Sequence, residues 1–226
     1  MKKSLSKLFL IFQVSFKLGL LNVLQVLIYR IFLSFVFVKF FFPIKKIKKT
    51  KSFFYAFKND KKLRHSFSKK VIPCADQILK GKMVYFCNQS FNLGENLDWF
   101  YNPYNNKHYK NHKLHWIKLK DFDKEFGDIK VIWELSRFNW IGTLAYAYKV
   151  TLDIKYLNKI NSLFSDWIEK NPLNRGPNWK CGQETSIRMI NIIISIELLG
   201  HKNISENCIK FLRFHLERLN LTIFYA

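Results

Sequence analysis

The sequence predicts an all-α protein, and two observations carry that prediction. Bulky apolar residues recur at helical spacing through four consecutive segments, which are residues 131–149, 154–170, 183–199 and 204–224. Short turns connect these segments, and helices of this length joined by short turns pack as antiparallel hairpins. Periodicity alone does not decide whether such hairpins close into a barrel, a bundle or a solenoid.

An apolar helical extension is predicted for residues 1–44. The stretch from Leu8 to Phe42 is broken by polar and charged residues, so no clean run reaches the roughly 20 residues of a membrane-spanning helix. No small-residue cleavage site follows the basic start, unlike in a signal peptide. Two interpretations stay open: an interfacial helix pair at a membrane, or a helix packed on the main domain with polar residues outward.

Residues 45–70 are predicted to form a poorly packed basic linker. Residues 1–70 hold 17 Lys and Arg against one acid, so most of the net charge of +22 lies at this end. Such charge suits nucleic acid, anionic lipid or an acidic polymer, and it is also typical of a solvated linker. No nucleic-acid-binding motif accompanies it, so nucleic acid is not an expected partner. An anionic membrane surface would be contacted through residues 1–51.

The third predicted unit, residues 71–226, begins irregularly and then becomes regular. Up to Gly127 the mixture of Asn, Gly, Pro and aromatic residues predicts loops, short helices and a strand. The four periodic segments follow. A Pro- and Gly-containing turn at residues 171–177 separates the second from the third, and Gly200 is expected to cap the third.

No metal site is predicted. His108, His112 and His115 lie close in sequence, but their surroundings indicate a loop, and no carboxylate stands at ligand spacing. The four cysteines form no Cys-x-x-Cys pair. The three histidines are therefore expected to be exposed, whereas His215 lies on an apolar helix stripe and is expected in the core.

A series of motifs appears in a fixed order along the body of the chain. They are Trp133–Phe138, Leu144–Tyr148, Asp166–Pro172, Gly176–Trp179 and Gln183–Arg188, with Ala75-Asp76, Asp98-Trp99 and His115-Trp116 upstream. In this order the motifs resemble the heparinase II/III family of polysaccharide lyases, over roughly residues 71–226.

The resemblance implies an incomplete (α/α) toroid of helical hairpins followed by a C-terminal β-sandwich. It implies cleavage of uronic-acid polysaccharides by β-elimination, without a cofactor. In the family an Asn or His neutralises the uronate carboxylate, and a Tyr or His moves the proton. The neutralising segment is expected one helix beyond Gln183–Arg188, about where this chain ends. No catalytic residue is therefore predicted, and the chain is expected to be the inactive N-terminal part of a lyase.

Three candidate substrate contacts are aromatic or amide side chains. Asn178 and Trp179 stand in a Gly- and Pro-rich loop, where a Trp can stack on a sugar and an Asn can bond a hydroxyl. Alternatively, Trp179 closes the end of a hairpin. Trp140 could also be a stacking platform, but its helical spacing with Leu144 favours the core.

Three further candidates are charged: Arg137, Glu184 and Arg188. Glu134 and Arg137 are three residues apart, and Glu184 and Arg188 are four apart, so ordinary intrahelical ion pairs are favoured. The alternative is a central cleft in which an Arg binds a substrate carboxylate bidentately. Under either interpretation the resemblance makes an acidic polysaccharide the expected partner.

A second function class is a non-catalytic, membrane-associated protein that binds glycan or assists surface-polysaccharide assembly. This interpretation rests on the basic, apolar N-terminal region, which a freely secreted lyase does not need. A degraded gene product without activity is a third interpretation. The sequence leaves membrane-associated, periplasmic and cytoplasmic locations open.

Overall fold

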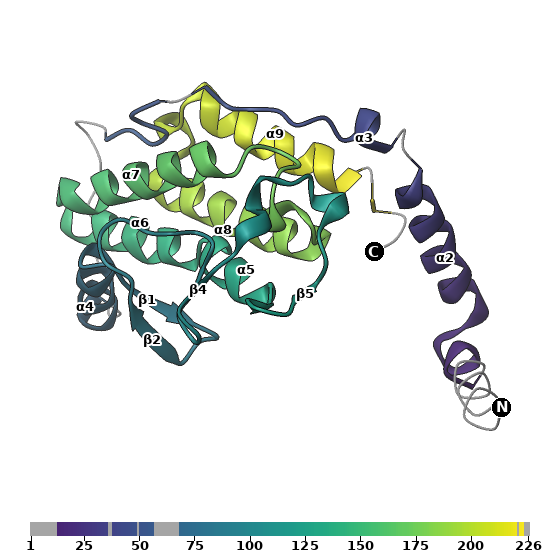
Figure 1. Cartoon of the computed structure of the whole chain (residues 1–226). Coiled ribbons are helices and arrows are strands. Elements are labelled where there is room, and N and C mark those ends of the chain that lie inside the picture. Colours follow the sequence, from purple (N-terminus) through teal and green to yellow (C-terminus); the bar gives the residue numbers. More distant parts are fainter. Residues whose placement is uncertain (1–12, 36–37, 49, 57–67, 221, 224–226) are drawn as a thin grey trace. The chain divides into compact units, whose positions relative to one another are not determined.

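The computed structural model describes residues 13–35, 38–48, 50–56, 68–220 and 222–223. The chain forms two compact units, one of residues 44–220 and one of residues 1–43 with 221–226. Helices dominate both, and the strands are short (Figure 1). The predicted all-α class is confirmed, whereas the closure of the helices into a toroid stays a prediction.

The N-terminal unit contains α2 (Leu20–Ser34) and α3 (Val38–Phe41). Gly19, with a φ of 87°, separates α2 from the helical residues 13–18. No residue of α2 is buried, and Leu21 is 76% exposed. Among the described residues, no helix has the length and apolar character needed to cross a membrane.

Residues 45–48 and 50–56, the described first part of the predicted linker, belong to the main unit, and the expectation of poor packing was wrong at its two buried aromatic residues. Isolated antiparallel bridges join this segment to Leu173 and to Ile204. Phe53 and Phe54 are buried, at 0% and 1% exposure. Both rings contact the side chain of a Phe on α7. The apolar pair therefore anchors a segment in which half of the other residues are lysines.

Three short antiparallel hairpins precede the helical body. Residues 57–67 of the predicted linker lie outside the described residues, and α4 (Ser68–Leu79) follows. The hairpins pair β1 (Lys82–Tyr85) with β2 (Gln89–Asn92), β3 (Tyr101–Asn102) with β4 (Lys107–His108), and β5 (Phe122–Asp123) with β6 (Gly127–Asp128). A Cβ at Gly81, where φ is 78°, would collide with the Gly94 carbonyl, so the first hairpin closes only with glycine there.

The helical body comprises α5 (Lys130–Ser136), α6 (Asn139–Thr151), α7 (Ile154–Lys170), α8 (Gly182–Leu199) and α9 (Glu206–Asn220). The sequence predicted one helix over residues 131–149, but the chain breaks between α5 and α6. Phe138 takes a φ of 66° at the break and is fully buried. The break directs the Phe138 ring into the core. The helical spacing of apolar residues continues before and after the break. The predicted bounds of α7 are confirmed, and Gly200, at a φ of 94°, ends α8.

Aromatic rings from several helices form the centre of the main unit. Phe138 meets Trp167 edge-on at 5.0 Å between ring centroids, and Phe164 meets Phe211 at 4.8 Å. Such edge-to-face pairs add about 0.5–1.5 kcal/mol beyond the burial of area. The break between α5 and α6 is thus fixed by the packing of α7 and α9 around Phe138.

We predict that Asn161→Ala destabilises the main unit by about 2–4 kcal/mol. Asn161 Oδ1 accepts hydrogen bonds from the amides of Phe53 and Phe54, at 2.8 and 2.9 Å, and its Nδ2 donates to the Phe54 carbonyl. Truncation leaves these buried backbone groups without partners. Chemical denaturation of the variant measures the loss. Asn158→Ala, at an exposed position of the same helix, should change stability by less than about 0.5 kcal/mol, and an equal effect of both would contradict the account.

Candidate functional site

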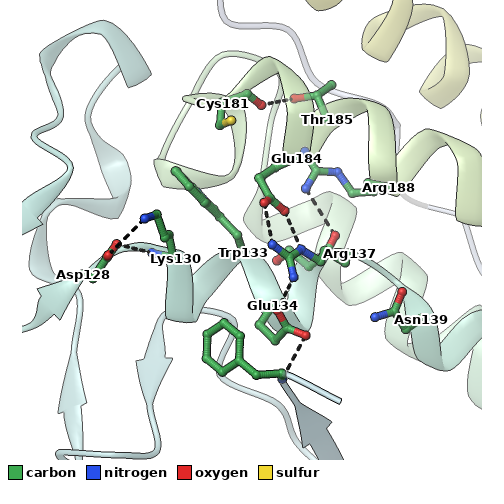
Figure 2. A network of polar contacts seen from close by, with 12 residues as sticks. Asp128, Lys130, Trp133, Glu134, Arg137, Asn139, Cys181, Glu184, Thr185 and Arg188 are labelled. Atoms are coloured by element: carbon green, nitrogen blue, oxygen red, sulfur yellow. Dashed lines mark hydrogen bonds and ion pairs between the residues drawn. The ribbon is translucent and has the colours of Figure 1, made fainter. Parts of the chain in front are cut away.

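One guanidinium links two helices through two carboxylates. Arg137, directly after α5, donates from Nε and Nη2 to the two carboxylate oxygens of Glu184 on α8, each at 2.7 Å. Its Nη1 donates to Glu134 on α5. Figure 2 shows Arg137 held between the two glutamates. The predicted Glu134–Arg137 pair is confirmed, but it belongs to a three-residue network that spacing did not reveal.

The predicted ion pair between Glu184 and Arg188 was wrong. Glu184 turns toward Arg137, and Arg188 points into the core with an exposure of 0%. The guanidinium of Arg188 donates to the carbonyls of Ser136 and Asn178, at 3.2 and 2.7 Å. Helical spacing places two side chains near one another, but it does not fix where each one points.

Arg188 is surrounded by aromatic rings. Its guanidinium carbon lies 4.8 Å from the ring centroid of Trp167, 5.4 Å from that of Trp179 and 5.9 Å from that of Phe138. No carboxylate within the described residues forms an ion pair with it. Burial lowers the pKa of Arg188 to about 9, so it stays charged at neutral pH. Cation–π contacts and carbonyl dipoles therefore stabilise this buried charge.

His215 completes the surroundings of Arg188, and its predicted core position is confirmed. Its Nε2 accepts a hydrogen bond from Arg188 Nε at 2.9 Å, and its Nδ1 donates to the Phe211 carbonyl at 2.9 Å. These two bonds fix the neutral tautomer with the proton on Nδ1. Burial, and then the charge of Arg188, lower the pKa of His215 well below 6.5.

Two of the candidate sugar contacts are core residues in this structure. Asn178 is 0% exposed, and its Nδ2 donates to the side chain of Asn171 at 2.8 Å. Trp179 is 2% exposed, and its indole N–H donates to the Asn171 carbonyl. Arg218 donates in turn to the Trp179 carbonyl at 2.8 Å. These contacts favour the interpretation that Trp179 closes a hairpin end.

A groove opens beside the Arg137 network. Its cavity volume is about 330 Å³, at the small end of ligand sites. The lining comes from α4, from the β1–β2 hairpin and from α5 and α6. The lining residues are Cys74, Gln77, Ile78, Lys82, Met83, Val84, Ser90, Glu134, Leu135, Asn139, Trp140 and Thr143.

Glu134 belongs to both the network and the groove. Its Oε2 accepts from Arg137, and its Oε1 accepts from the amide of Phe86 at 3.1 Å. Each carboxylate oxygen can accept a second hydrogen bond, for example from a sugar hydroxyl. Because Phe86 follows β1 directly, the same carboxylate ties the hairpin to α5.

Trp140 lines the groove while remaining mostly in the core. It is 6% exposed, and its indole N–H donates to the Leu135 carbonyl at 3.2 Å. Lys82 and Asn139, which the sequence analysis missed, also line the groove and are exposed. They lie 57 residues apart in sequence and carry no shared motif, so only the folded arrangement of hairpin and helices could reveal them.

The three histidines predicted to be exposed differ from one another. His108 is exposed and its Nδ1 lies 2.6 Å from an Asp98 carboxylate oxygen. His112 is half-buried and stacks on a Phe ring. His115 is 8% exposed, so the prediction of exposure was wrong for this residue. Its Nδ1 accepts a hydrogen bond from the amide of Ile117 at the start of a short 3₁₀ helix. Within the described ranges no three His, Cys, Asp or Glu side chains gather in a metal-binding group.

Comparison with known proteins identifies the family. Residues 41–214, about three quarters of the chain, match the family described as heparinase II/III N-terminus, so the chain belongs to the heparinase II/III family. A heparin-sulfate lyase of Bacteroides stercoris is 33% identical over 84 residues, a stretch that covers 37% of this chain and 9% of that protein. The match therefore spans a small part of the relative's length. No solved structure matches the chain significantly.

We predict that the main unit loses stability as the pH falls below about 6.5. The pKa of His215 is lower in the folded protein than in the unfolded chain, so below about 6.5 the unfolded chain binds the additional proton. The contribution is complete at neutral pH and falls by up to about 1.4 kcal/mol per pH unit as the pH approaches the depressed pKa.

Denaturation midpoints between pH 8 and about 5 measure this decline. His215→Gln should be less stable at neutral pH but should show a shallower decline. His201→Gln, at a side chain that is 74% exposed, should keep the decline of the natural protein. An equally steep decline in both variants would contradict a role for His215.

Proposed function

We propose that residues 44–220 form the polysaccharide-binding part of a lyase that acts on uronic-acid polymers by β-elimination. The groove bordered by Glu134 carries this proposal. It combines a carboxylate for sugar hydroxyls, the amide of Asn139 and the ammonium of Lys82 at one site. Membership of the heparinase II/III family and the likeness to a heparin-sulfate lyase support an acidic polysaccharide as the ligand.

The proposed role of this groove is binding and orientation of the polymer. β-Elimination needs a group that neutralises the uronate carboxylate and a base, typically Tyr or His, that removes the C5 proton. The residues that line the groove include neither Tyr nor His. Arg137 donates three of its five N–H groups to glutamates, so its first role is to hold α5 and α8 in register. A substrate carboxylate is therefore assigned to Lys82 rather than to Arg137.

Lys82→Ala is expected to weaken the binding of a heparin-derived octasaccharide about three- to tenfold, because it removes the cation of the groove. Isothermal titration calorimetry measures the affinity. Lys80→Ala is the matched control, because this substitution removes the same charge at an exposed position that does not line the groove. Ultraviolet absorbance of the same mixture should show no unsaturated uronate formed by the 226-residue chain. Equal effects of the two variants, or formation of that product, would overturn the proposed role of the groove.

A membrane-associated, glycan-binding protein without lyase activity is the second candidate function. The exposed apolar residues of α2 favour it, together with the exposed lysines Lys46, Lys48 and Lys51. An apolar helix followed by a basic segment is a common two-part signal for anionic lipid surfaces.

This candidate predicts that the chain co-sediments with vesicles containing phosphatidylserine and much less with phosphatidylcholine vesicles. Replacing Lys46, Lys48 and Lys51 together by Gln should weaken binding by about 1 kcal/mol per charge at low salt. Replacing Lys155, Lys159 and Lys170 on α7 by Gln is the control for net charge. If the chain binds neither kind of vesicle, this candidate function is refuted.

A further inference from the structure

Three aromatic rings, two from the β1–β2 hairpin and one from the turn between β3 and β4, form a cluster. Phe86 is 43% exposed and Tyr104 is 44% exposed, whereas Phe91 is half-buried and less exposed than either. The ring centroids of Phe91 and Tyr104 are 4.9 Å apart, and those of Phe86 and Tyr104 are 6.3 Å apart. These three residues are called the aromatic platform below. Exposed rings gathered in this way are uncommon on a soluble surface and indicate a binding site.

A buried tyrosine ring contacts two members of the platform. Tyr85 is 1% exposed, and its ring lies 5.5 Å from Phe91 and 6.4 Å from Tyr104. The turn itself places Phe86 at a φ of 48° and Cys87 at 66°, a region that residues with a Cβ rarely adopt. The bond from the Phe86 amide to Glu134 helps to hold that turn. An unfavourable backbone thus keeps a large apolar ring at the surface, which is typical of functional sites.

Glu134 joins the platform to the groove. Its carboxylate lines the groove and also accepts a hydrogen bond from the amide of Phe86. Burial, and then the charge of Glu134, raise the pKa of Tyr104. Arg137 keeps two N–H groups outside its bonds to glutamate and is 26% exposed. Polar partners for hydroxyl or acidic groups therefore stand beside flat apolar rings.

We propose that the aromatic platform is a second sugar subsite, which stacks a pyranose ring of the polysaccharide that occupies the groove. This inference rests on the proposed function. The C–H face of a pyranose packs on aromatic faces, while its hydroxyls bond neighbouring carboxylate and guanidinium groups. A short oligosaccharide fills the groove alone, whereas a longer one passes Glu134 and reaches the platform.

Calorimetric titration of the 226-residue chain with a heparin-derived disaccharide and octasaccharide tests this subsite. Tyr104→Ala and Phe86→Ala should each weaken octasaccharide binding about three- to tenfold and leave disaccharide binding unchanged. Tyr104→Phe should bind like the natural protein, because stacking needs the ring and not the hydroxyl. Tyr55→Ala is the matched control, since Tyr55 is also 44% exposed and lies outside the platform.

The outcomes separate the two proposals. If the natural chain binds both oligosaccharides but Tyr104→Ala and Tyr55→Ala bind as it does, the subsite is refuted and the groove stands. If the disaccharide also loses affinity in Tyr104→Ala, the ring belongs to the groove itself and the second subsite is refuted. If the natural chain binds neither oligosaccharide, the proposed function fails, and the subsite fails with it.

Discussion

The buried charge of Arg188 is the constraint on which the rest of the helical unit depends. A guanidinium that is removed from water needs compensation from every side, and here three elements supply it. The end of α5 offers the Ser136 carbonyl, the loop before α8 offers the Asn178 carbonyl, and α9 offers the ring of His215. Aromatic faces fill the remaining directions. Three segments distant in sequence are thereby fixed around one side chain of α8.

The position of α8 determines which partners the side chains near Arg188 can reach. Because Arg188 binds inside the core, Glu184 one turn earlier is left to receive Arg137, and the resulting network reaches the surface. Arg137 in turn orients Glu134, whose second oxygen holds the turn of the β1–β2 hairpin. A chain of charge-assisted hydrogen bonds thus runs from the core to the rim of the groove. The helix α8 thus carries both Arg188, which binds in the core, and Glu184, which belongs to the network at the groove.

The sequence predicted regular elements well and side-chain partners poorly. The bounds of α7 were correct because Asp153 caps its start and the apolar period ends at a Pro-containing turn. The break at Phe138 was missed, since it arises from tertiary packing while the period continues on both sides. Arg188 and Glu184 fit a standard ion-pair spacing, yet desolvation and partners from other segments turned them apart. Lys82 could be assigned to the groove only after the hairpin was seen folded beside α4 and α6.

Backbone amide chemical shifts during titration with a heparin-derived octasaccharide test the central claim most directly, because they report where an acidic polymer binds. The account predicts that the amide of Phe86, which is bonded to Glu134, and the amide of Asn139, which lines the groove, shift together and saturate with a single affinity. The amide of Tyr55, which donates to the Asn203 carbonyl away from the groove, should not move. Shifts confined to the lysine-rich residues 45–51, with Phe86 and Asn139 unchanged, would contradict the assignment of the groove as the polysaccharide site.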